Sequence, residues 1–212
     1  PEGNSVEYTY DDATCNSSEK RCTHNVKTIK QNPKQGSDLT ALTTSSTYDA
    51  LTNQIATSTD AKGNVTNFSY NTNGTLSKVE LPADNAGIRP ETTYTYVSYT
   101  PTTFPELSLP ETVTKKINST QSIATKTTYN STNKYVPNTI VEDIGTGKLN
   151  LTNTFTYDAV GNLTKVDGPR TDVTDTITTA YNTERLPTQV TDGLSKVTKN
   201  FYDADGRVVR TA

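Results

Sequence analysis

Large apolar residues are scarce in this 212-residue sequence. Leu, Ile, Val and Phe together account for 39 residues, which is just under the share of about 20% at which a chain of high net charge is expected to be disordered. The formal net charge is only −3, from 20 basic and 23 acidic residues. Because charge repulsion is weak and tyrosines recur in phase, we expect an ordered chain with a thin core.

Several classes of protein are disfavoured by what is missing. Nucleic-acid binding requires a basic face, whereas the sequence pI is about 5.2. Because there is no apolar run of 18 residues, no membrane-spanning helix is expected. The sequence also has no recognisable signal peptide. The first residues resemble the middle of a unit and the last residues stop just after a turn, and we therefore expect a piece of a longer protein.

Thiols and imidazoles are also few. Cys15 and Cys22 predict a local disulfide that closes a polar loop, with two free thiols as the alternative. Together with His24 and either Asp11 or Glu19 they could supply zinc ligands, but their spacing matches no usual zinc pattern. A single histidine in a polar loop gives no catalytic constellation. We predict no catalytic residue, no cofactor and no metal site.

Threonine and tyrosine are the abundant residues, with 43 and 12 copies. Both fit a pleated, half-buried surface, so they favour β-structure. In the segment 151–157, Leu151, Phe155 and Tyr157 share one face and three threonines share the other. The same alternation occurs in residues 6–10, 93–96 and 173–181. A period of two with one apolar face predicts half-buried strands, and no segment has helical spacing.

A short motif, Tyr-Asp-x-x-Gly-Arg/Asn, recurs along the chain. It is clearest from Tyr157 to Asn162 and from Tyr202 to Arg207. With weaker copies, the tyrosines stand at positions 10, 48, 70, 96, 129, 157, 181 and 202, at spacings of 21 to 38 residues. Such self-similarity is typical of an array of supersecondary units. We expect one array over residues 1–212, with degenerate, loop-inserted units at about 11–47 and 97–150.

The motif predicts a tight hairpin. Its Asp accepts hydrogen bonds from amides two residues on, and its Gly adopts a left-handed conformation that closes a hairpin with a bulge. Leu163 and Val166 are three residues apart in the next strand, so we expect them on opposite faces of a curling sheet. The predicted turn and anchor residues are Tyr157, Asp158, Gly161, Tyr181, Tyr202, Asp203 and Gly206.

Other polar features have simpler explanations than catalysis. Asp203 and Asp205 resemble part of a calcium loop, but the distal Glu is missing. Glu142 and Asp143 are neighbours, which places them on opposite faces of a strand and makes them a weak glycosidase pair. The anchor tyrosines are expected to pack, with their hydroxyl groups at the surface. Tyr99 and Tyr135 lie out of phase with the repeat and are the better candidates for contact with a ligand.

The repeats resemble the Rhs or YD-repeat family, in which Tyr-Asp is followed by a Gly-Arg/Asn turn, an apolar strand and a Pro- and Gly-containing turn. The segments 157–169, 202–208 and 60–70 carry this resemblance most clearly. It implies an all-β, antiparallel strip of hairpins that spirals into a hollow shell. In bacterial polymorphic toxins and insecticidal toxin complexes, this shell encloses a toxic C-terminal domain. The segment that performs aspartyl self-cleavage in the family has no counterpart in this sequence.

The resemblance therefore implies a non-catalytic shell segment of a bacterial secreted or cell-surface protein. Its expected partners are flanking repeats of the same polypeptide and an enclosed toxin domain. In teneurins a similar shell serves cell-surface recognition, so a surface adhesion module that binds a glycan or receptor is the alternative. An isolated strip has unpaired strand edges at both ends, and we also expect it to self-associate.

Overall fold

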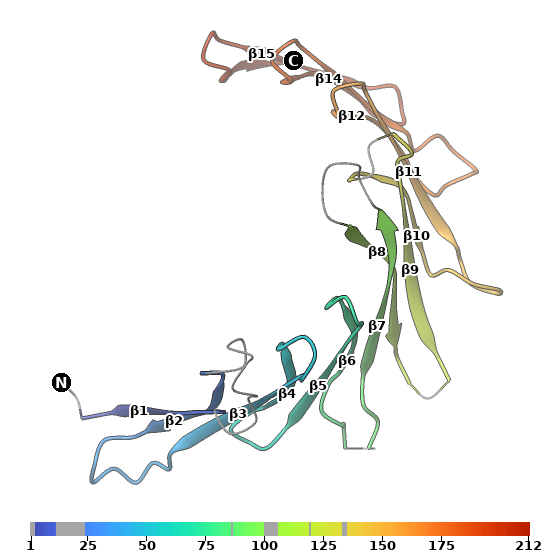
Figure 1. Ribbon diagram of the computed structural model, residues 1–212. Helices are drawn as coiled ribbons and strands as arrows, with labels where there is room; N and C mark the ends of the chain where they lie inside the picture. The colour runs from blue at the N-terminus through green and yellow to red at the C-terminus, as the bar shows by residue number, and fades with distance from the viewer. Residues whose placement is uncertain (1–2, 12–23, 86, 100–105, 119, 133–134) are drawn as a thin grey trace. The chain divides into compact units, whose positions relative to one another are not determined.

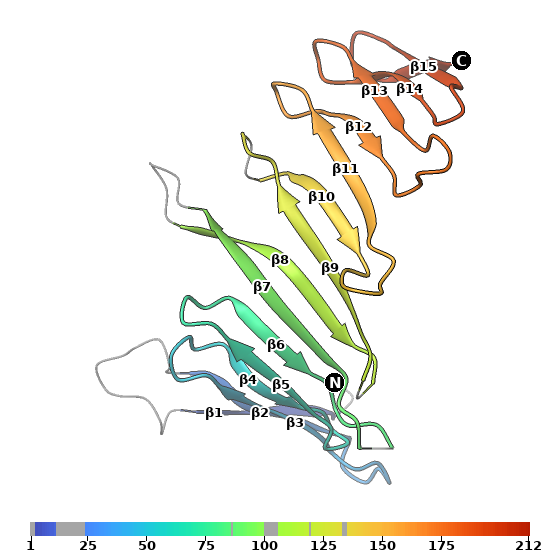
Figure 2. The same ribbon diagram turned by 90° about the vertical axis from the view of Figure 1, so that its right-hand side faces the viewer.

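The described part of the chain folds entirely into strands, turns and loops. The computed structural model describes residues 3–11, 24–85, 87–99, 106–118, 120–132 and 135–212. These residues contain sixteen strands and no helix, and the order of the strands in the sheet is their order in the sequence (Figures 1 and 2). Paired strands run antiparallel. The predicted all-β strip of antiparallel hairpins is therefore confirmed.

The chain divides into two compact units, of which the first comprises Pro1–Tyr94 and Thr114–Ser122. It contains the strands β1 (Ser5–Tyr10), β2 (Val26–Asn32), β3 (Leu42–Tyr48), β4 (Ile55–Thr59), β5 (Val65–Tyr70), β6 (Leu76–Glu80) and the first part of β7 (Glu91–Tyr99). Three tyrosine-ended strands, β1, β3 and β5, each begin a hairpin here.

The second unit comprises Thr95–Val113 and Ile123–Ala212. It contains the end of β7, most of β8 (Leu107–Lys116), and the strands β9 (Ser122–Tyr129), β10 (Pro137–Glu142), β11 (Leu151–Tyr157), β12 (Leu163–Asp167), β13 (Ile177–Tyr181), β14 (Pro187–Thr191), β15 (Val197–Tyr202) and β16 (Val208–Thr211). The strands β9, β11, β13 and β15 again end in a tyrosine. The sequence pattern thus marks the first strand of each hairpin.

The hairpins whose pairing the structure describes share one irregularity beside the tyrosine. Phe155 pairs with Val166, but Tyr157 pairs with Leu163, because one residue of β12 is left unpaired in a β-bulge. The bulge places Leu163 and Val166 on the same face, so the expectation of opposite faces was wrong. The register shifts in the same way at Tyr10, Tyr48, Tyr70, Tyr129, Tyr181 and Tyr202.

The bulges sort the side chains of each unit onto two unlike faces. We call the face that carries the anchor tyrosines the tyrosine face; with them lie apolar residues such as Ile29, Ile55, Phe68 and Val79 in the first unit and Ile140, Phe155, Val166 and Val190 in the second. The opposite face, the threonine face, carries many Thr and Ser side chains, together with charged residues such as Lys30, Lys78 and Lys165. Among the described residues no side chain is fully buried, so neither face covers a closed core.

One predicted strand starts later than expected. The alternation in residues 173–181 predicted a strand, but β13 begins only at Ile177. The preceding residues form a loop in which the Asp175 side chain accepts the Arg170 amide at 3.0 Å, while the Thr176 hydroxyl donates to Asp167. These side-chain bonds satisfy the backbone locally and compete with strand pairing. Near the start of the loop-inserted unit predicted at about 97–150, Tyr99 lies in β7, and residues 100–105 lie outside the described ranges.

Candidate functional site

One five-residue turn recurs throughout the chain. Its first residue donates its amide to the carbonyl of the fifth, and the amide of the fourth donates back to the first; in the Asp158 turn these distances are 3.0 and 3.1 Å. The fourth residue there, Gly161, has a φ of 90°, which favours glycine. The same turn occurs at 60–64, 71–75, 84–88, 182–186, 192–196 and 203–207.

The first side chain of the turn fixes its shape. Asp158 accepts the amides of Val160 at 3.1 Å and Asn162 at 2.8 Å. Hydrogen bonds, above all from the Asn162 backbone amide, hold the pKa of Asp158 below its ordinary value of 3.8. Asp203 accepts the amides of Asp205 and Arg207 at 3.0 and 2.9 Å in the same way. These carboxylates are therefore committed to turn structure.

Two turns lack glycine at the left-handed position. Arg185 and Ser195 have φ values of 65° and 62°. Arg185 nevertheless has a role there, because its Nε donates to the Asn162 side chain at 2.7 Å. It thereby links the turn of one hairpin to the turn of the preceding one. In the first unit, the Gln54 side chain donates to the Gly74 carbonyl at 2.7 Å and makes an equivalent link.

The anchor tyrosines connect successive hairpins. The Tyr48 hydroxyl donates to the Val26 carbonyl at 2.9 Å, and Val26 is the residue that pairs with the preceding anchor, Tyr10. Tyr181 donates to Leu163 at 2.9 Å in the same arrangement. Further bonds of this kind join Tyr70 to Ile55 (2.8 Å), Tyr129 to Pro110 (2.6 Å) and Tyr202 to Pro187 (2.7 Å). The hydroxyl groups are thus bonded to the neighbouring hairpin, which sequence reasoning missed.

The tether is a consequence of the bulge. The bulge leaves one residue unpaired beside each tyrosine. This brings the carbonyl of the residue opposite one anchor within reach of the hydroxyl group of the next anchor. Partial burial raises the pKa of Tyr70, Tyr129 and Tyr157 above the ordinary value of 10.0, with a smaller contribution at Tyr70 from the charge of Asp49. These three side chains are therefore neutral at physiological pH, and Tyr70 and Tyr129 are hydrogen-bond donors to the preceding hairpins.

The threonine face adds hydroxyl pairs across strands. Thr9 and Thr28 are 2.6 Å apart, Thr47 and Thr57 are 2.7 Å apart, and Thr128 and Thr139 are 2.7 Å apart, measured between their Oγ1 atoms. Each pair stands one step before an anchor tyrosine. Cross-strand threonine pairs of this kind stabilise a sheet by about 0.2–1 kcal/mol each. These hydroxyl pairs stabilise the threonine face.

Tyr99 and Tyr135, the out-of-phase tyrosines, do come together. Their ring centroids are 6.4 Å apart, and the rings stand at 87° to each other. Tyr99 also lines a hollow of about 220 Å³ with Val97, Leu109, Glu111 and three residues of β9, which are Thr127, Thr128 and Tyr129. The Glu111 carboxylate there lies 3.3 Å from the Lys126 ammonium. This hollow is the most site-like feature of the second unit.

The other residues that the sequence offered as possible catalytic or metal-binding residues make structural contacts. The His24 ring meets the edge of Tyr10 at 6.4 Å. Glu142 ends β10, and Asp143 follows it at a φ of 49°, with a carboxylate oxygen 3.4 Å from Lys148. Among residues that the structure describes, no three His, Cys, Asp or Glu side chains gather as a metal site would require. The predicted Cys15–Cys22 disulfide lies outside the described residues.

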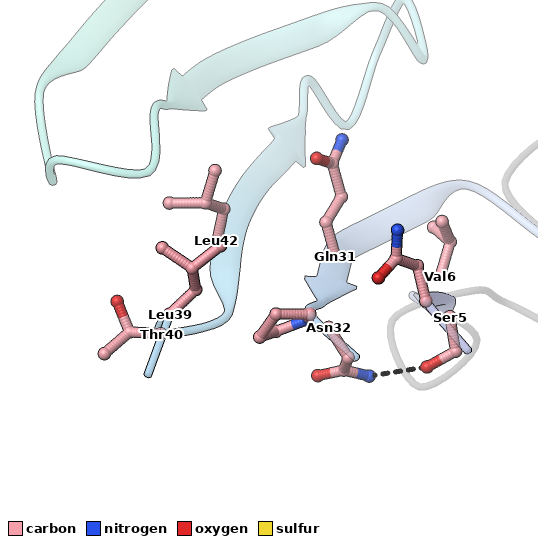
Figure 3. Close-up of a pocket in the computed structure, with 9 residues that line it drawn as sticks. Ser5, Val6, Gln31, Asn32, Leu39, Thr40 and Leu42 are labelled. Atoms are coloured by element: carbon pink, nitrogen blue, oxygen red, sulfur yellow. Dashed lines mark hydrogen bonds between the residues drawn. The ribbon is translucent and has the colours of Figure 1, made fainter. Parts of the chain in front are cut away.

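An open groove crosses the ends of β1, β2 and β3 (Figure 3). It has a volume of about 450 Å³ and is lined by exposed apolar side chains, notably Val6, Leu39 and Leu42. On its polar side the Asn32 amide donates to Ser5 at 3.2 Å and to Glu7 at 2.6 Å. The groove has no convergent set of acids, bases or nucleophiles.

Fold and geometry together define a strip of bulged hairpins tied by tyrosine hydroxyls. No protein-family model matches the chain, and no match was found among curated proteins. In the described part of the chain there is no helix of the length and apolarity that crossing a bilayer would demand.

Solved structures do share the fold. A crystal structure of TcdB2-TccC3-TEV matches with a TM-score of 0.61 at 15% identity, over 89% of this chain and 10% of that chain. TcdB2-TccC3 without its hypervariable C-terminal region matches at 0.46 and 18% identity, over 90% and 12% of the two chains. A Photorhabdus luminescens Tc holotoxin pore, whose TccC3 is mutated, matches at 0.46 and 18% identity, over 88% and 12%. The first likeness confirms the resemblance to an Rhs/YD-repeat shell at the level of the fold, and this chain spans about a tenth of that protein.

Proposed function

We propose that this chain is a wall segment of a larger secreted bacterial protein, in which a shell of repeats encloses a toxin domain. The observation that carries the proposal is the chain of tyrosine tethers, which builds a sheet hairpin by hairpin and leaves both faces without a core. A sheet that separates two aqueous spaces requires this construction, whereas a solid domain buries one face.

The fold shared with TcdB2-TccC3-TEV supports the same function, since the structural match extends over 89% of this chain. The segment itself is proposed to be non-catalytic. Its repeated carboxylates, such as Asp158 and Asp203, accept amide bonds within their own turns. The groove and the Tyr99 hollow bring together no nucleophile with a base.

The test compares access to the two faces within the full polypeptide. Single cysteines replace Ile177 and Thr178, which are adjacent and exposed and lie on the tyrosine face and the threonine face. Cys15 and Cys22 are changed to Ser in both variants. A bulky maleimide reagent should label both positions in the isolated chain. In the full polypeptide, one of the two should react much more slowly, because it faces the enclosed space.

The matched pair makes the outcome decisive. Protection of a single face supports a closed wall, and unfolding in urea should restore equal labelling. Equal, fast labelling of both positions in the full polypeptide contradicts enclosure. An electron cryomicroscopy map of that polypeptide then shows whether a separate domain lies within the shell; a map with nothing inside would remove the toxin-enclosing part of the proposal.

A second candidate function is glycan binding, and the Tyr99–Tyr135 pair favours it. Exposed aromatic rings stack on sugar rings, and the adjoining hollow supplies Glu111 and threonine hydroxyls as polar partners. A glycan array with the purified chain tests this function. Binding that is lost in Tyr99→Ala but kept in the control Tyr8→Ala would support it. An array without signal, or signal unaffected by Tyr99→Ala, would eliminate this site.

A further inference from the structure

The turn between β5 and β6 contains a dipeptide that occurs once in this chain. Asn73-Gly74 is the only Asn-Gly pair among the 212 residues. Asn is a chemically labile residue, and a following Gly leaves the Asn side chain open to attack by the next backbone nitrogen, because Gly has no Cβ. Asn73 is exposed and Gly74 is half-buried. The sequence therefore places the most reactive Asn of the chain in a turn.

Hydrogen bonds of the folded chain hold the groups that would react. The Gly74 amide donates to the Asn71 carbonyl at 2.9 Å, and the Gly74 carbonyl accepts the Gln54 side-chain amide at 2.7 Å. The Asn73 side-chain oxygen accepts the Thr75 amide at 3.2 Å and the Thr75 hydroxyl at 2.7 Å. Both the nitrogen that would attack and the side chain that would be attacked are thus bonded within the closed turn.

We propose that Asn73 is a site of spontaneous deamidation, and that the hydrogen bond from Gln54 to Gly74 limits the rate in the folded chain. When the turn opens, the Gly74 nitrogen bonds to the Asn73 Cγ. The side-chain nitrogen of Asn73 leaves as ammonia with the proton that the Gly74 amide loses. Water then opens the five-membered imide at either carbonyl and gives aspartate or isoaspartate. This inference rests on the fold and is independent of the shell function.

The bond that limits the reaction comes from a neighbouring hairpin. Gln54 ends the turn between β3 and β4, and its side chain reaches the turn between β5 and β6. Attack requires loss of the Gly74 amide proton, which the closed turn directs at the Asn71 carbonyl. Opening the turn displaces Gly74 and therefore also breaks its bond to Gln54. The reaction is confined to the small fraction of molecules in which the turn is locally open.

The product cannot re-form the closed turn. In isoaspartate the main chain runs through the side-chain methylene, which adds one atom to the backbone between positions 73 and 74. The Gly74 amide and carbonyl then no longer meet Asn71 and Gln54 as they do in the closed turn. Either product also adds a negative charge to an exposed turn. Isoaspartate at position 73 therefore removes the link between two hairpins of the first unit permanently.

The experiment measures deamidation at each Asn during incubation of the chain at neutral pH. Peptide mapping by mass spectrometry locates the change, and chromatography separates aspartate from isoaspartate peptides. In the unmodified chain Asn73 should react first. Gln54→Ala should accelerate its reaction about fivefold, because one hydrogen bond that closes the turn is lost. The control Arg185→Ala removes the corresponding link of the second unit and should leave the rate at Asn73 unchanged.

Urea separates the effect of the turn from the chemistry of the dipeptide. In the unfolded state, the unmodified chain and Gln54→Ala should react at one rate, which should exceed the rate of either folded chain. Gly74→Ala should slow the reaction in urea, where its effect on folding does not matter, because the added Cβ obstructs attack.

Three results would overturn the proposal. These are an Asn73 that reacts no faster than the other Asn residues, equal rates in the folded and unfolded chains, or equal effects of Gln54→Ala and Arg185→Ala on the folded rate. Far-UV circular dichroism of both variants verifies that their strands are intact.

Discussion

Removing one tyrosine hydroxyl tests the idea that tethers hold the hairpins together. Tyr181→Phe keeps the ring on the tyrosine face and deletes only the 2.9 Å bond to the Leu163 carbonyl. A hydrogen bond of this type contributes a net of about 1 kcal/mol to folding. We therefore expect the free energy of unfolding to fall by about 1 kcal/mol and the thermal midpoint to fall by about 4 °C.

The assay is urea unfolding followed by far-UV circular dichroism, with Tyr8→Phe as the control. Tyr8 lies on the same face and is 52% exposed, but it is not an anchor. Hydrogen exchange gives the local measure: in Tyr181→Phe, amides of β13 and β12 should lose protection while those of the first unit keep theirs. If the two variants unfold at the same urea concentration and exchange alike, the hydroxyl bond does not couple the hairpins, and our reasoning fails.

Four other outcomes are expected. Burial raises the pKa of Tyr70, Tyr129 and Tyr157, so their stabilisation is complete below pH 10.0 and is lost as the pH rises through the folded values; urea midpoints that increase between pH 10 and 11.5 would contradict this. The lowered pKa of Asp158 gives a contribution to folding stability that is present above pH 3.8 and is lost as the pH falls through the folded value. In Asp158→Asn the urea midpoint should therefore decrease less on acidification than in the unmodified chain. Ser195→Gly should stabilise the chain by about 1 kcal/mol in urea unfolding, because it relieves a φ of 62°; destabilisation would refute the strain argument. Gly193→Ala should destabilise by about 1–3 kcal/mol in the same assay, since its Cβ would collide with the Thr174 carbonyl, and an unchanged midpoint would show that the loop yields freely.

The strands could be predicted because their signal is local. Alternation in residues 151–157 predicts a strand with the limits that β11 has, Leu151–Tyr157. The same rule placed a strand too early at residue 173, because Thr, Asp and Val alternate there inside a loop that is held by side-chain bonds. An alternation with a period of two indicates which side chains a strand would bury. It does not indicate whether polar side chains form hydrogen bonds that hold the segment in a loop instead.

The type of turn could be predicted from the sequence, but the face of the sheet on which the following side chains lie could not. A Tyr-Asp-x-x-Gly motif indicates a bulged hairpin, yet the one-residue shift that brings Leu163 and Val166 onto one face depends on which residue the bulge omits. The tethers were hidden for a similar reason. A tyrosine hydroxyl finds its acceptor in another hairpin, 18 residues earlier for Tyr181, and no local pattern encodes that distance.

The candidate site was predicted only in part. Tyr99 and Tyr135 were predicted as candidate contact residues because they lie out of phase with the repeat, and their rings are in contact in the structure. The Glu111–Lys126 pair beside them had no signal, because the two residues are joined only through the pairing of distant segments. Arg185 was missed as well, since a left-handed arginine that reaches the previous turn departs from the glycine rule that defines the motif.

The coincidence of strand order with sequence order has a consequence for biosynthesis. When a strand emerges from the ribosome, the strand it pairs with has already been made, and no later segment has to be awaited. Contact order is therefore low for an all-β protein, and low contact order accompanies rapid folding. The nascent chain can lengthen its sheet one hairpin at a time, in the direction of translation.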